Sequence, residues 1–205
     1  MAKLDVPPTK STHLALRRDL EFAQEGYDLL EQKRQILVLE LMGRLEGARR
    51  AQEAVDEAMA QAFEVLREDA LRMGTEAMAR EAMGIEREHQ LSIQSHQIMG
   101  LELPSVEAEH EPPRPEFGLA SGSALSDEVM RRFTEALDAV ARLAEIENAV
   151  FRLASEVRRT QRRVNALDKV FIPDYKETIA YIEDVLEERE RESFVIMKMT
   201  KERLQ

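Results

Sequence analysis

Two stretches of this 205-residue chain place apolar residues at alternating steps of three and four positions. Such heptad spacing keeps an apolar seam on one side of a helix, and it is typical of coiled coils rather than of a broad globular core. The first seam contains Leu16, Leu20, Ala23, Tyr27, Leu30, Arg34, Leu37 and Leu41, of which only Arg34 is charged. The second contains Leu143, Ile146, Val150, Leu153, Val157, Thr160, Val164, Leu167 and Phe171.

The two seams predict two long helices joined by a different kind of segment. We expect a tail over residues 1–10, a first helix over 11–73 and a second helix over 126–205. At 1.5 Å per residue, these helices would be on the order of 90 and 120 Å long. Because the chain reverses its direction between the two helices, these helices must run antiparallel. The predicted fold class is therefore all-α, a long antiparallel two-helix coiled coil with a small central β-hairpin and loop.

The second seam changes its rhythm near Pro173. Tyr175 and Ile179 follow Phe171 at two successive steps of four, which is the pattern of a stutter. Proline also removes a backbone donor from the helix. We therefore expect a kink near Pro173.

Residues 74–125 interrupt the helical pattern. Glycines recur in them, and the stretches 91–95 and 101–103 alternate apolar with polar residues. Alternation of this kind predicts a short β-hairpin, which we place at about residues 89–105. Three prolines and two glycines over about 107–122 predict a mobile loop.

The composition excludes several classes of protein. Charged residues make up 34% of the chain and aromatic residues 5%, which fits long helices. The net charge of −11 disfavours nonspecific binding to nucleic acid, which depends on neutralising phosphates. The chain has no cysteine and no apolar run of about 20 residues, so we expect neither disulfides nor a membrane span. These features indicate a cytoplasmic protein.

Several motifs beyond the seams resemble the D subunit of the V-type and archaeal-type rotary ATPases. The most specific is the run of two arginine pairs before Val164-Asn165-Ala166-Leu167, followed by Ile172-Pro173 and by alternating Glu and Arg over residues 187–192. The similarity runs from about residue 8 to residue 195. It also includes the segments PTKST (8–12), AQEGYDLLEQKR (23–34) and IMGLELP (98–104).

The resemblance implies a mechanical role without chemistry. In this family a two-helix shaft stands inside a ring of three catalytic A and three B subunits, and it transmits torque to the membrane ion-translocating ring. Its implied partners are the A3B3 ring, the small F subunit of the central stalk and a connector on the rotor ring. The implied location is peripheral to the membrane, with no direct insertion. The chain itself would bind no nucleotide or other cofactor.

Four arginines are candidates for partner contact. On the heptad, Arg158, Arg159, Arg162 and Arg163 fall outside the seam positions. They are either a solvated face or a surface that meets acidic groups on a surrounding subunit. The resemblance favours contact, and the negative net charge disfavours the third alternative, nucleic acid.

The end of the second helix is a second candidate contact. Phe194, Met197 and Lys198 belong to a short amphipathic segment. This segment would either anchor to a membrane or, as the resemblance favours, slide against an apolar sleeve in the catalytic ring.

No catalytic or metal site is predicted. The acidic run Glu183–Glu192 could in principle bind a metal, but i,i+4 ion pairs such as Glu187–Arg191 explain it more simply. The four histidines lack the spacing of metal ligands, and no phosphate-binding loop is present. Arg34 in the seam either fixes the register or extends its charge to solvent.

Two alternative functions share the helical pattern. A prefoldin-like chaperone also joins two coiled-coil helices by β-hairpins, but the helices here are longer and no broad apolar clamp is evident. A generic coiled-coil tether is the other alternative.

Overall fold

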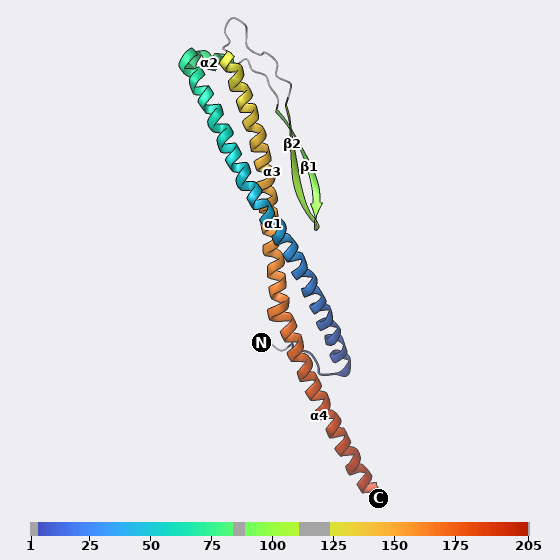
Figure 1. The fold of residues 1–205 in the computed structure, drawn as a ribbon. Coiled ribbons are helices and arrows are strands. Elements are labelled where there is room, and N and C mark those ends of the chain that lie inside the picture. Colours follow the sequence, from blue (N-terminus) through green and yellow to red (C-terminus); the bar gives the residue numbers. More distant parts are fainter. Residues whose placement is uncertain (1–3, 84–88, 111–123, 205) are drawn as a thin grey trace. The chain divides into compact units, whose positions relative to one another are not determined.

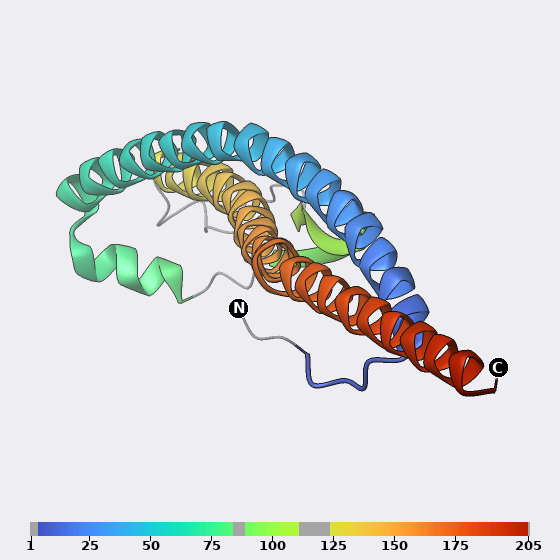
Figure 2. The same cartoon turned by 90° about the horizontal axis from the view of Figure 1, so that it is seen from below.

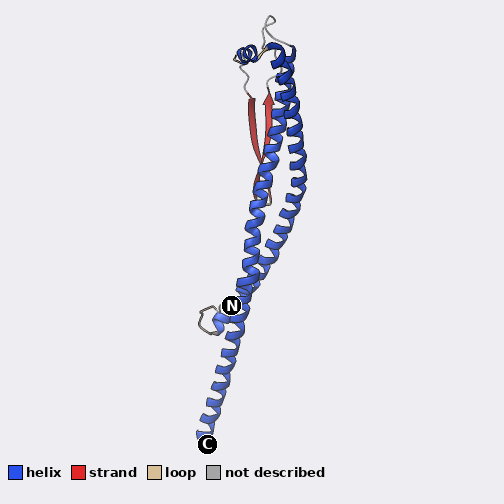
Figure 3. Cartoon of the chain, turned by 90° about the vertical axis from the view of Figure 1, so that its left-hand side faces the viewer, coloured by secondary structure: helices blue, strands red, loops and turns tan. Residues whose placement is uncertain are grey.

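The computed structural model describes residues 4–83, 89–110 and 124–204. In chain order, the elements are α1 (Lys10–Met73), α2 (Thr75–Ala82), β1 (His89–Ile98), β2 (Leu101–His110), α3 (Ala124–Ala166), a π-helical turn (Leu167–Phe171) and α4 (Ile172–Leu204). Figures 1 and 3 show long helices and one small hairpin, so the predicted fold class is confirmed. The chain divides into two compact units, residues 1–36 with 157–205 and residues 37–156.

In the first unit, the start of α1 packs antiparallel to α4. Leu16 is buried with Ile179 and Ile182. Partly buried residues surround this core, namely Leu4, Val6, Leu20, Tyr175 and Leu186. Figure 2 shows the beginning of α1 and α4 within this unit. Burial of these apolar side chains is what holds the two helices together.

The segment before α1 also lies against α4. The backbone N–H of Leu4 donates to Oγ1 of Thr178 at 3.2 Å, and Arg189 donates to the carbonyl oxygen of Pro8 at 2.9 Å. Oγ1 of Thr9 accepts a hydrogen bond from the backbone N–H of Thr12 at 3.2 Å. A threonine side chain in this position caps a helix, which explains why α1 begins at Lys10.

A π-helical turn explains the altered rhythm near Pro173. Val164 and Tyr175 are eleven positions apart, whereas alternating steps of 3, 4 and 3 would separate them by ten. A π-helical turn accommodates one additional residue, and Leu167–Phe171 lies inside this interval. Because the seam changes phase here, Phe171 is 49% exposed although its spacing matches the preceding seam residues.

In the second unit, the end of α1 packs antiparallel to the start of α3. The rings of Phe63 and Phe133 meet edge to face, with centroids 5.4 Å apart. Nearby, Arg132 donates to the side-chain oxygen of Gln61 at 2.9 Å. The buried apolar residues along these helices are Leu37, Val55, Ala62, Ala136, Ala149 and Leu153.

The hairpin belongs to the second unit and is longer than the sequence predicted. β1 pairs antiparallel with β2 from His89↔His110 to Ile98↔Leu101. Residues 107–110 thus continue β2 instead of forming the expected loop, because they pair with the start of β1. The rest of the expected loop lies outside the described residues. Met99 and Gly100 connect the strands with φ values of 51° and 78°. Two successive positive φ values are those of a type I′ turn.

Hydrogen bonds connect the hairpin to α3. The backbone N–H of Val106 donates to the Glu145 carboxylate at 2.9 Å, and Arg152 donates to the carbonyl oxygen of Glu102 at 2.7 Å. Leu103 is fully buried, so β2 also contributes apolar packing.

A short helix between α1 and the hairpin was not predicted. Gly74 ends α1 with φ of +83°, a conformation that glycine adopts without steric cost. The chain then forms α2 over Thr75–Ala82, a segment rich in alanine and other good helix formers.

Candidate interaction surface

The four candidate arginines lie exposed on α3. Arg158, Arg159, Arg162 and Arg163 are all solvent-exposed, whereas the neighbouring seam residues Thr160 and Val164 are buried. None of the four makes an ion pair with another described residue. The structure thus brings these four side chains together as one exposed cationic surface on one helix.

The last turns of α4 expose a second set of predicted residues. Every residue from Glu187 to Leu204 is exposed. The large apolar side chains among them are Phe194, Val195, Ile196, Met197, Met199 and Leu204, and Lys198 lies in their midst. Phe194 retains 66% of its surface in solvent. An apolar surface of this kind is typical of a binding site for another protein.

The seam residues differ in how far they are buried. Leu16, Leu37, Leu153 and Val164 are buried. The others, apart from exposed Phe171, are partly exposed within the described chain, namely Leu20, Tyr27, Leu30, Leu41, Leu143, Ile146, Val150, Val157 and Leu167. Small residues at or next to the seam, including Ala23, Ala149 and Thr160, are buried more completely than most of the large ones. A two-helix packing leaves one side of most large seam residues open to solvent.

Ion pairs connect α1 to α4 in the first unit. Nζ of Lys10 lies 2.6 Å from Oε1 of Glu190. Oε1 of Glu183 lies 2.8 Å from Nε2 of His13 and accepts a hydrogen bond from Arg17 at 3.0 Å. The hydrogen bond from His13, and then the charge of Arg17, lower the pKa of Glu183. Lys10 likewise lowers the pKa of Glu190 through its hydrogen bond and charge.

Arg34 forms its ion pair within α1. Its guanidinium donates two hydrogen bonds to the carboxylate of Glu31, one of them at 2.7 Å from Nε. These hydrogen bonds lower the pKa of Glu31 to about 2. The charge in the seam is thus neutralised by a neighbour on the same helix.

The acidic run on α4 makes ion pairs on its own helix. Arg191 lies 3.1 Å from Glu187, one turn away. Across the described residues, no three His, Cys, Asp or Glu side chains come together as a metal ion would require. The described helices also include none that is long and apolar enough to span a membrane.

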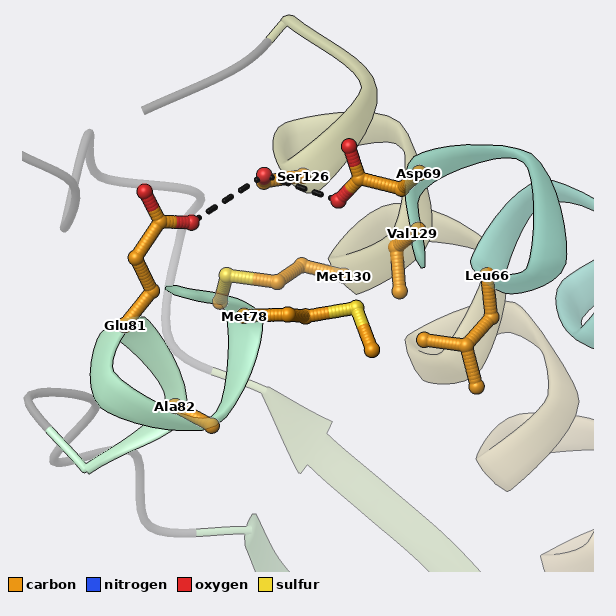
Figure 4. A pocket seen from close by; sticks show the side chains of 8 residues that line it. All are labelled: Leu66, Asp69, Met78, Glu81, Ala82, Ser126, Val129 and Met130. Carbon is orange, nitrogen blue, oxygen red and sulfur yellow. Dashed lines mark hydrogen bonds between the residues drawn. The ribbon is translucent and has the colours of Figure 1, made fainter. Parts of the chain in front are cut away.

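A buried polar cluster in the second unit was missed by the sequence analysis. Oγ of Ser126 lies 3.0 Å from Oδ2 of Asp69 and 3.3 Å from Oε2 of Glu81, as Figure 4 shows. Asp69 is only 1% exposed. The burial of Asp69 could have been predicted from its spacing, because Val55, Ala62 and Asp69 follow each other at intervals of seven and thus share a heptad position. No local pattern in the sequence indicated that α2 would bring Glu81 to the same place.

Comparison with known proteins covers nearly the whole chain. The family model for the D subunit of ATP synthase matches residues 12–202. The D subunit of the V-type ATP synthase of Thermotoga neapolitana is 39% identical over 98% of this chain and 99% of its own length. The D 2 subunit of the V-type ATP synthase of Treponema pallidum is 38% identical over 98% of this chain and 96% of its own. The D subunit of the A-type ATP synthase of Methanopyrus kandleri is 36% identical over 97% of this chain and 86% of its own length. The chain belongs to the family of ATP synthase D subunits.

Proposed function

We propose that this chain is the non-catalytic central-stalk rotor subunit of a V/A-type rotary ATPase or ATP synthase. In this role it transmits torque between the catalytic A3B3 ring and the membrane ion-translocating ring. It works at the cytoplasmic side, attached to the membrane through the complex. The observation that carries the proposal is membership of the D-subunit family over residues 12–202.

The helices have properties that suit a shaft. α1 is a single helix of 64 residues, and α3, the π-helical turn and α4 follow one another without a break from Ala124 to Leu204. A hydrogen-bonded helix resists bending and stretching better than a chain of short elements joined by loops. Within each unit the antiparallel partner adds packing contacts, and in the first unit ion pairs also join α1 to α4. These contacts oppose separation of the helices.

We propose that two exposed surfaces bind partners. We assign the apolar end of α4 around Phe194, Met197 and Lys198 to an apolar sleeve in the A3B3 ring. We assign the arginines at 158, 159, 162 and 163 to acidic groups of a surrounding subunit, because exposed cations without ion pairs in the described chain are available to bind carboxylates. The small F subunit of the central stalk and a connector of the rotor ring complete the proposed set of partners.

Native mass spectrometry of the intact complex tests this role. A rotor shaft predicts one copy of this chain beside three A and three B subunits. A homo-oligomer without ATPase subunits would overturn the proposal and favour a self-assembling coiled-coil protein.

Truncation after Glu192 tests the assignment of the α4 end. Residues 193–204 are exposed throughout, so their removal should leave the melting temperature of the free chain unchanged. In the complex, the truncation should reduce ATP-driven ion transport relative to ATP hydrolysis. A matched variant with Phe194→Ser and Met197→Ser should reproduce the effect in part. Equal coupling in truncated and full-length complexes would refute the assignment.

A further inference from the structure

We infer that the pocket between α1, α2 and α3 in the second unit receives a basic side chain, lysine or arginine, from another subunit of the complex. Leu66, Asp69, Met78, Glu81, Ser126 and Met130 are among the residues that line it (Figure 4). The inference rests on the proposed function only in requiring that the chain works inside a multi-subunit complex.

The two carboxylates have too few hydrogen-bond donors. Among the described contacts, the hydroxyl of Ser126 is the one donor within reach of Asp69 and Glu81, and it carries a single hydrogen. That hydrogen can be donated to only one of the two carboxylates at a time. Oδ1 of Asp69 and Oε1 of Glu81 are buried and accept no hydrogen bond from the described part of the chain. Buried carboxylate oxygens without donors are unfavourable, so a donor from outside would be bound strongly.

The rest of the pocket is suited to an aliphatic chain. Its volume is about 110 Å³, and its other walls are formed by side chains such as Leu66, Met78, Val129 and Met130. Figure 4 shows that Met78 and Met130 lie beside the two carboxylates. Lysine and arginine combine a long apolar stem with a cationic head, so the stem would contact the methionines while the head meets the carboxylates. Glu81 is half-buried and Ala82 is exposed, which leaves the pocket accessible from the surface.

A basic side chain fits this pocket better than a metal ion. Mg²⁺ and Ca²⁺ prefer six or more oxygen ligands. The described residues offer two carboxylates and one hydroxyl, and the remaining lining is apolar or thioether. A hydrated ion would place its waters against that apolar lining, whereas an alkyl chain would not.

Carboxyl footprinting tests whether the pocket becomes occupied. The free chain and the intact complex would be treated with a carbodiimide and glycine ethyl ester, and labelling would be read by mass spectrometry. We expect labelling of Glu81 to fall at least fivefold in the complex. Exposed Glu76 on the same helix is the matched control and should change less than twofold. Carbodiimide without the ester distinguishes the two cations, because only lysine forms an amide cross-link with Glu81.

Asp69→Asn and Glu81→Gln distinguish binding from internal stability. Each removes the negative charge of a carboxylate that has one buried oxygen without a donor, so the free chain should melt at the same or a higher temperature. The same variants should weaken its binding to the remaining subunits at least tenfold. Glu76→Gln removes an exposed charge from α2 and should change neither quantity.

Three results would overturn the inference. The first is equal labelling of Glu81 in the free chain and in a complex that contains it. The second is a lower melting temperature of both variants with unchanged binding, which would show that the pair serves the chain alone. The third is a drop in melting temperature on adding EDTA that Mg²⁺ or Ca²⁺ reverses, which would assign the pocket to a metal. If the chain does not copurify with ATPase subunits, the proposed function fails instead.

Discussion

In the unit formed by residues 1–36 and 157–205, the buried centre is apolar, with Leu16, Ile179 and Ile182 in contact. In the unit formed by residues 37–156, the heptad series of Val55 and Ala62 continues into Asp69, which faces Ser126 and Glu81. The helix α1 thus buries an apolar side chain, Leu16, in one region and a carboxylate, Asp69, in the other. The presence of an apolar centre is explained by its contribution to the stability of the fold. The buried charge contributes little to stability, and its presence is better explained by binding.

The largest expected effect is in the apolar centre. Ile182→Ala should lower the free energy of unfolding of its unit by about 2–5 kcal/mol, because Ile182 is fully buried and its removal leaves a cavity. Ile196→Ala, on the same helix but 63% exposed, is the matched control and should cost less than about 0.5 kcal/mol. Circular dichroism in urea measures both. Equal losses of unfolding free energy for the two variants would show that Ile182 does not belong to a buried apolar centre.

The opposite sign is expected in the polar cluster. Asp69→Leu should raise the free energy of unfolding by about 1–2 kcal/mol, since it replaces a buried carboxylate, one oxygen of which has no donor, by an apolar residue. The hydroxyl of Ser126 keeps Glu81 as its partner. The same urea titration reads the change. A lower free energy of unfolding for Asp69→Leu would show that the buried carboxylate stabilises the fold, and the two regions would then not differ in this respect.

A smaller gain in stability is expected at the hairpin. Met99 has a positive φ of 51°, which is unfavourable for a residue with a long side chain. Asn tolerates this conformation and is preferred before Gly in type I′ turns, so Met99→Asn should stabilise the hairpin by about 1 kcal/mol. Gly100→Ala, at φ of 78°, should destabilise it. Amide hydrogen exchange of β1 and β2 follows both changes, and slower exchange in the alanine variant would contradict the assigned turn.

The smallest effect concerns the ion pairs of the first unit. His13 and Arg17 lower the pKa of Glu183 below its unfolded value. Its contribution is therefore complete above about pH 4.3 and is lost as the pH falls through the lower folded pKa. Because the carboxylate is partly exposed, we expect less than about 1 kcal/mol. Glu183→Gln should reduce the loss of stability between pH 6 and pH 3, and exposed Glu177→Gln should not. Identical pH profiles for wild type and Glu183→Gln would refute the role of this pair.

Much of the fold followed from spacing alone. The heptad series predicted two long helices, and the alternation at residues 91–95 predicted the hairpin. The hairpin's full length was not predicted, because residues 107–110 are held by cross-strand pairing and consist mainly of Glu and Ala, which are uncommon in strands. The spacing of the seam showed one extra residue between Val164 and Tyr175. The sequence did not, however, distinguish a kink from the π-helical turn that accommodates this residue.

The binding surfaces were predictable to different degrees. The exposed arginines at 158, 159, 162 and 163 followed from their heptad positions. Asp69 could have been noticed as a charge at a seam position. Its partner Glu81 could not, because their proximity depends on the turn at Gly74 and on the position of α2, which are tertiary features.

The central claim is that this chain turns inside a catalytic ring. Because the chain has no cysteine, a single cysteine introduced at exposed Gln94 of the hairpin can carry one biotin and one bead. With the A3B3 ring fixed to glass, we predict that the bead rotates in one direction, in steps, at a rate that rises with ATP concentration. A bead whose motion is the same with and without ATP, on complexes that hydrolyse ATP normally, would contradict the account.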